Sequence, residues 1–423
     1  MKHFRLLVLG NGVSAYGSYL NMVALNVFVY DVTGSALAAG LFMAVRLGTS
    51  VGAGFVSGRL VSAYDRKRLI VGADLCQALA LLALLLAPEG GRVSLLYCLA
   101  VVTGSCSTLS QVALRSSIPE IVGAEHRTRA NSLLVTGRSL AMIAGFASAG
   151  VVVAQLGYTV AFVLDAATFL VSASVLLSLP IRTKALPKAP EGGEGGGAGA
   201  PAAAHPSLRL LWAGAPLLLA MIAVRAVDGL GSSSHNVALP VYSSLLDPDH
   251  PATFVSRFWA TWAIGTIIAQ QVLSRYTRRT GHTFGERAFA VGACVMSAAF
   301  IVVFGGLPTV PLLATALVAG IADGFTEVVY VSRLQAVPDE QRGRLFGFSA
   351  SAENAGFGLG MLVSGSLLES FSPFQVVAAL HGLAIVLCLG LLVLLVLRRA
   401  PATATGAGRL REPGGDVLHE GRG

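Results

Sequence analysis

Long apolar runs dominate this chain. We count about twelve, each near the roughly 20 residues that an α-helix needs to cross a bilayer core. They cover about 6–30, 36–57, 69–87, 93–114, 131–154, 158–180, 213–246, 253–273, 287–305, 310–332, 345–369 and 374–397. Since 54% of the residues are hydrophobic and only 12% are charged, an ordinary soluble domain is excluded. The sequence predicts an all-α membrane protein with twelve transmembrane helices.

Lys and Arg residues fall mainly into alternate gaps between these runs. One set of gaps holds clusters such as Arg66, Lys67 and Arg68, whereas the other holds little more than Arg92. Because cationic loops resist translocation, the first set predicts cytoplasmic loops, and an even number of spans places both termini in the cytoplasm. This topology accounts for the net charge of +8, so we expect no nucleic-acid partner.

A Gly- and Pro-rich segment separates the runs into two groups of six. Its composition cannot bury apolar area, so residues 181–207 are predicted to form a flexible cytoplasmic linker. The N-terminal half then covers 1–180 and the C-terminal half 208–399. Residues 400–423 are predicted to be a disordered cytoplasmic tail.

The two halves share a weak internal repeat. Gly145 follows Arg129 by 16 residues and Gly360 follows Arg344 by 16, and a second glycine, Gly150 or Gly365, comes 5 residues later in each half. Repeated halves around a site near the membrane midplane are typical of secondary transporters.

Several motifs carry a family resemblance. They are the start Phe4-Arg5-Leu6-Leu7, the loop Gly58-Arg59-Leu60 with Asp65-Arg66-Lys67-Arg68-Leu69, and the segments 118–122, 130–133 and 337–344. With these motifs the chain resembles the major facilitator superfamily, and more narrowly its bacterial drug- and siderophore-exporter-like branch.

The resemblance implies two pseudo-symmetric six-helix halves, a monomer surrounded by lipid, and a location in the bacterial inner membrane. It also implies an inner-loop gating motif, here Gly58, Asp65, Arg66, Lys67 and Arg68. The chain departs from the family where Ser62 and Ala63 replace an Asp and an Arg of that motif, and where Phe146 replaces the Pro of the antiporter motif.

Ionisable residues inside the spans are costly and therefore mark candidate sites. Embedded acids outnumber embedded cations, and an acid without a full partner in low-dielectric surroundings is suited to carry a proton. We expect Asp323 or Glu327 to be the proton-responsive group, followed by Asp228. Alternatively, these acids only hold waters or helix ends and shape the cavity. Asp74, near the inner end of its span, is interpreted as reaching the basic loop.

The embedded cations and nearby polar groups are candidates for the substrate cavity. These candidates are Arg138, Arg225, Tyr19, Asn26, His235 and Asn236. A guanidinium such as that of Arg138 suits an anionic part of the substrate. Alternatively, Arg138 pairs with an acid such as Asp165, and the amides only join helices.

Arg46 and Glu353 both lie near the predicted midplane. Their spans pack together across the two halves in the resembled fold. We therefore expect an Arg46–Glu353 ion pair between the halves, unless each residue pairs within its own half.

The leading functional prediction is a secondary active transporter, with proton-coupled efflux of a small amphiphilic compound such as a drug, siderophore or secondary metabolite. An uptake permease of the same fold and a non-transporting membrane sensor or scaffold are the alternatives. No nucleotide-binding loop, His-rich metal cluster or nucleophile motif is present, so we expect neither an enzyme nor a cofactor. All five cysteines fall within apolar runs, where they are expected to be small buried hydrophobes.

Overall fold

The fold is known from a computed structural model that describes residues 2–122, 127–179, 216–336 and 339–397. The described residues form α-helices and one short 3₁₀ turn, and contain no strand, which confirms the all-α prediction. The elements are α1 Lys2–Thr33, α2 Ala36–Ala63, α3 Arg66–Leu85, η1 Glu89–Gly91, α4 Arg92–Val122, α5 Arg127–Ser178, α7 Pro216–Leu246, α8 Pro251–Thr280, α9 Glu286–Val303, α10 Thr309–Gln335, α11 Asp339–Leu368 and α12 Pro373–Leu397.

Helix α5 contains two spans in one continuous assignment. At Gly157 the backbone leaves helical geometry, with φ at 80° and ψ at 171°. Glycine reaches positive φ at no steric cost, so the chain can turn here between the two predicted runs. With its two arms counted separately, the described α-helices number twelve. By length and composition, eight helical stretches of the described residues qualify as membrane spans, one of them covering both arms of α5.

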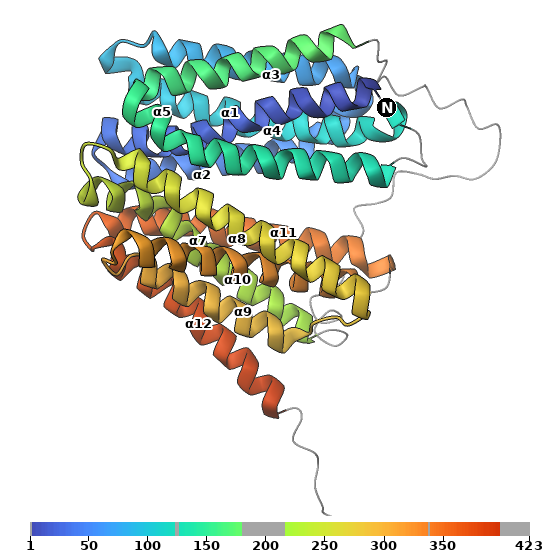
Figure 1. Cartoon of the computed structure of the whole chain (residues 1–423), viewed down its shortest axis with the longest axis vertical. Coiled ribbons are helices and arrows are strands. Elements are labelled where there is room, and N and C mark those ends of the chain that lie inside the picture. Colours follow the sequence, from blue (N-terminus) through green and yellow to red (C-terminus); the bar gives the residue numbers. More distant parts are fainter. Residues whose placement is uncertain (1, 123–126, 180–215, 337–338, 398–423) are drawn as a thin grey trace, which may run out of the picture.

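The helices lie in two groups (Figure 1). Helices α1 to α5 form the blue-to-green group, in which α1 packs on α5 and α2 on α4. Helices α7 to α12 form the yellow-green-to-red group, in which α7 packs on α11 and α8 on α10. The groups meet where α5 contacts α8 and α2 contacts α11. The predicted linker and tail lie outside the described residues, so the predicted domain limits stay predictions.

Hydrogen bonds between the groups lie toward one end of the molecule. We call the end at which α1 begins and α5 and α12 end the terminal end, and the other the distal end (Figure 1). Near the distal end, the Ser256 hydroxyl donates to the Phe146 carbonyl at 2.5 Å. At that end, the Ser35 hydroxyl and the Leu37 amide both donate to Glu369, at 2.7 and 3.0 Å; Glu369 follows α11. The same Ser256 hydroxyl also contacts the Ala147 carbonyl of α5 at 3.4 Å.

The predicted inner-loop motif ties α3 to its own group. Asp65 caps α3, its carboxylate accepting from the Arg68 amide at 3.0 Å. Arg66 donates to the Ser116 carbonyl of α4 at 2.9 Å, and Lys67 donates to the Leu179 carbonyl after α5 at 2.7 Å. Gly58 lies one turn before the end of α2. The motif thus braces the α2–α3 turn, and its gating role stays a prediction.

Candidate functional site

The C-terminal group contains an ion cluster around Arg225. Its guanidinium donates to Asp228 on the same helix at 3.2 Å and to Glu327 of α10 at 2.5 Å, and it lies 3.8 Å from Glu353 of α11. Asp323, one turn before Glu327 on α10, also interacts electrostatically with it. Four acids thus face one cation, and three helices share the cluster.

Aromatic and hydroxyl groups border this cluster. The Arg225 guanidinium lies over the Tyr330 ring, 5.4 Å from its centroid. The Tyr330 hydroxyl is 2.5 Å from the Ser349 hydroxyl, which donates to Glu353 at 2.8 Å. One carboxylate oxygen of Asp228 and the Nε of Arg225 are buried without a hydrogen-bond partner. The cluster therefore retains capacity to bind a proton or a polar ligand group.

A cavity of about 220 Å³ opens beside these charges. It is lined by Arg225, Asp228, Gly229, Ser232, Glu353, Asn354 and Phe357. Gly229 is needed at this point because a Cβ there would lie 2.9 Å from the Glu353 carbonyl oxygen. The close approach of α7 and α11 is what brings Arg225 within reach of Glu353.

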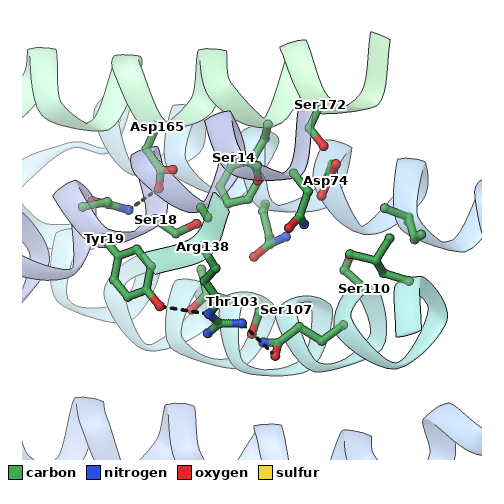
Figure 2. Close-up of a pocket in the computed structure, with 18 of the residues that line it drawn as sticks. Ser14, Ser18, Tyr19, Asp74, Thr103, Ser107, Ser110, Arg138, Asp165 and Ser172 are labelled. Carbon is green, nitrogen blue, oxygen red and sulfur yellow. Dashed lines mark hydrogen bonds between the residues drawn. The ribbon is translucent and has the colours of Figure 1, made fainter. Parts of the chain in front are cut away.

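A second cavity, of about 250 Å³, lies inside the N-terminal group (Figure 2). Its polar lining comes from five helices: Asn11, Ser14, Ser18, Tyr19 and Asn21 of α1, Arg46 of α2, Asp74 and Gln77 of α3, Thr103, Ser107, Ser110 and Gln111 of α4, and Arg138, Asp165 and Ser172 of α5. Apolar residues such as Leu114 and Phe169 complete the wall.

Arg138 lies at the exposed side of this second cavity. Its Nε donates to the Tyr19 hydroxyl at 2.9 Å and its Nη1 to the Gln111 amide oxygen at 3.1 Å (Figure 2). The Tyr19 ring in turn packs edge-on against Phe146, with 5.2 Å between centroids. The alternative Arg138–Asp165 pair is not formed, and Arg138 is instead held by neutral partners. Its binding of an anionic substrate group stays a prediction.

Asp165 is held deeper in the same cavity. Its carboxylate accepts from the Asn21 amide nitrogen at 2.7 Å and interacts electrostatically with Arg46. Gly17 allows this contact between α1 and α5, since a Cβ there would lie 2.6 Å from Asp165 Oδ1.

The structure does not form the expected Arg46–Glu353 pair. Helices α2 and α11 do pack across the two groups, as expected. However, among the described residues no ion pair within 4.0 Å joins these two side chains, and Glu353 faces Arg225 instead. The close approach of α7 and α11 turns Glu353 to Arg225, while Arg46 lines the second cavity and interacts electrostatically with Asp165.

Three predicted cavity residues line neither of the two cavities. His235 is 3% exposed, stacks on Phe300 with 3.8 Å between centroids, and lies 3.1 Å from a His381 nitrogen. Asn236 donates to the Ser232 carbonyl one turn earlier, and Asn26 is buried in α1. In this conformation His235 belongs to the core of the C-terminal group, together with His381.

Most of the polar wall of the second cavity is not among the predicted site residues. Thr103, Ser107 and Ser110 recur at steps of four and three residues along α4, which places them on one helical face. Asp165 and Ser172 follow the same periodicity on α5. Polar positions at helical spacing in otherwise apolar runs are the sequence signal that could have indicated this wall.

Comparisons with known proteins agree with this architecture. The model of the Major Facilitator Superfamily matches residues 7–330 and 281–418. The multidrug efflux pump Tap of Mycolicibacterium fortuitum is 26% identical over 412 residues, which cover 92% of this chain and 93% of that protein.

Solved structures resemble the chain over nearly its whole length. A bacterial homologue of the iron transporter ferroportin, in an inward-facing state, has a TM-score of 0.70 and 17% identity, covering 92% of this chain and 98% of its own. The nucleoside transporter NupG has a TM-score of 0.68 and 14% identity, with 93% and 99% covered. At such identities the likeness concerns the fold alone.

Proposed function

Since the chain belongs to the major facilitator superfamily, whose members are membrane transporters, we propose that it exports a small amphiphilic compound in exchange for protons. The two helix groups would alternate between opening at the terminal end and opening at the distal end. We place the protein in the bacterial inner membrane as a monomer, with the terminal end in the cytoplasm.

The ion cluster around Arg225 carries this proposal. Asp228, Glu327 and Glu353 come from three different helices, and Asp323 adds a fourth acid to a single guanidinium. Such an excess of acids in low-dielectric surroundings favours proton binding. Protonation of Glu327 would break its ion pair with Arg225 and weaken the link between α7 and α10. Proton uptake would thereby change how these helices pack.

The substrate would bind beside the same cluster. The cavity next to Arg225 offers one cation, two acids and the apolar ring of Phe357, which together suit an amphiphilic molecule with a polar group. Similarity to the efflux pump Tap supports export as the direction. The contacts between groups at the distal end support a state that opens toward the cytoplasm, from which an exported compound would enter.

Flux in proteoliposomes tests the proposal. Vesicles with an acidic interior should accumulate ethidium, a fluorescent amphiphilic cation, in a saturable manner that a proton ionophore abolishes. Asp323→Asn combined with Glu327→Gln should abolish this accumulation but keep exchange of ethidium across vesicles without a pH gradient. Asp247→Asn is the matched control, because Asp247 is an exposed acid in the α7–α8 connection.

The outcomes separate the alternatives. Accumulation that requires an acidic exterior would indicate an uptake permease. No saturable flux with any amphiphile would indicate a sensor or scaffold. Normal gradient-driven accumulation by the double variant would disprove the assigned proton site.

A further inference from the structure

The second cavity, inside the N-terminal group, has a role that proton-coupled export at Arg225 does not require. We propose that this cavity is a binding site for a singly charged cation, either an alkali ion or a primary ammonium group. The proposal rests on oxygen atoms that are buried there without partners and on the charges around them.

Three oxygen atoms of the cavity wall lack hydrogen-bond partners. They belong to Asp74 of α3, Asn21 of α1 and Ser110 of α4, with Asp74 and Asn21 each only 4% exposed. A buried polar oxygen that is left unpaired destabilises the protein, and a charged one does so more strongly. Three such atoms on three helices around one cavity are accounted for together by a ligand that all of them can contact. Figure 2 shows Asp74 and Ser110 on the wall of this shared space.

The charges of the cavity leave one acid unmatched. Asp165 has the Asn21 amide and the electrostatic interaction with Arg46. Arg138 is exposed and donates to Tyr19 and Gln111. Among the described residues, no cation lies within 4.0 Å of Asp74. One positive charge on a bound ligand would therefore balance the buried carboxylate of Asp74.

The donor atoms indicate the kind of cation. Carboxylate, amide and hydroxyl oxygens are hard ligands, which suit hard cations and N–H donors rather than thiolate-seeking metals. No cluster of three or more His, Cys, Asp or Glu side chains suited to a metal ion occurs in the described part of the chain. The donors here are mostly neutral, which matches a single charge on the ligand.

The cavity is separate from the one beside Arg225, since the two share no lining residue. At about 250 Å³ it has room for a partly hydrated ion or a small amine. The site can therefore be occupied whatever the other cavity transports.

Thermal unfolding of the purified full-length protein in detergent tests the site. Choline chloride, whose bulky cation has no N–H group, is replaced at constant ionic strength by sodium, potassium or methylammonium chloride. A bound ion at about ten times its Kd should raise the unfolding temperature by about 1–3 °C, and the rise should saturate. A rise with sodium or potassium identifies an alkali ion, and a rise with methylammonium alone identifies an ammonium group.

Two variants locate the effect, and a third is the matched control. Asp74→Asn should abolish the rise and, in choline, should unfold no earlier than the parent because it removes an unpaired buried charge. Ser110→Ala, a smaller change that should preserve folding, should weaken the affinity several-fold. Asp228→Asn, which removes a buried acid from the other cavity, should keep the full cation-dependent rise.

The proposal fails if no cation raises the unfolding temperature of the parent. It also fails if Asp74→Asn, or in its place Ser110→Ala, responds like the parent. Because this assay measures binding without flux, its failure is distinguishable from failure of the export proposal.

Discussion

Arg225→Met should strongly destabilise the C-terminal group. The Arg225 and Asp228 side chains are 13% and 6% exposed, so the variant leaves a buried carboxylate without its cation. Breaking a buried pair in this way costs about 3–5 kcal/mol. Glu327 is 42% exposed, and solvent screening limits its share of the loss to about 1 kcal/mol or less. The Asp228 contact should therefore dominate the effect.

Thermal unfolding in detergent, followed by tryptophan fluorescence, measures this loss. We expect the unfolding temperature of Arg225→Met to fall by about 3–6 °C, given the length of the chain. The double variant Arg225→Met/Asp228→Asn should recover most of the loss, since it removes the orphaned charge. Arg92→Met is the control, because its 4.0 Å contact with Glu89 is exposed. A single variant within about 1 °C of the parent, or a double variant no better than the single, would refute this reasoning.

Two further predictions concern the distal end. The Leu37 amide, followed by the Ser35 hydroxyl, holds the pKa of Glu369 below its ordinary value of 4.5. The contact of Glu369 with Ser35 and Leu37 should therefore be complete above pH 4.5 and be lost as the pH falls through the lowered pKa. Spin-label distances across the distal end should then widen in acid for the parent and stay constant for Glu369→Gln. Gly150→Leu and Gly365→Leu should each force the groups apart at the distal end, which increases the labelling of a cysteine introduced there. Gly390→Leu is the control, because nothing lies within 4 Å of its Cβ position. Equal labelling of all three variants would contradict the steric argument.

Local sequence patterns predicted the ion cluster in part. Arg225 and Asp228 are three residues apart, and Asp323 and Glu327 are four apart, so each pair had to share a helical face. The contact between Arg225 and Glu353 could not be predicted in the same way. It depends on the close approach of α7 and α11 at Gly229, which is a tertiary feature. The same approach explains why Glu353 does not reach Arg46.

The second cavity was harder to predict because single hydroxyl groups in membrane spans are ambiguous. The Thr103 hydroxyl bonds to the Leu99 carbonyl of its own helix at 2.7 Å, as such groups commonly do. Ser110 looks the same in sequence, yet its hydroxyl has no partner. The position of Asp74 near the end of its span favours contact with the basic loop, whereas the structure places it in the cavity wall. The neighbouring helices decide whether such a residue is buried and whether its polar atoms find hydrogen-bond partners.

The glycine repeat shows how a weak sequence pattern encodes both halves of the architecture. A Cβ on Gly145 would lie 2.7 Å from the Tyr16 carbonyl oxygen of α1, and one on Gly360 would lie 2.8 Å from Leu230 Cα of α7, the matching helix of the other group. The first glycine of each pair thus lets its helix pack within its own group.

The second glycine of each pair contacts the opposite group. A Cβ on Gly150 would lie 2.8 Å from Ser256 Cβ of α8, and one on Gly365 would lie 3.0 Å from Leu37 Cα of α2, again matching helices of the two groups. These contacts lie near the distal end, whereas the two acid-bearing cavities lie one in each group. A conformational change that opens the distal end must move the second glycines away from the opposite group, whereas the first glycines keep their contacts within their own group. The five-residue step between them therefore separates contacts that persist from contacts that break.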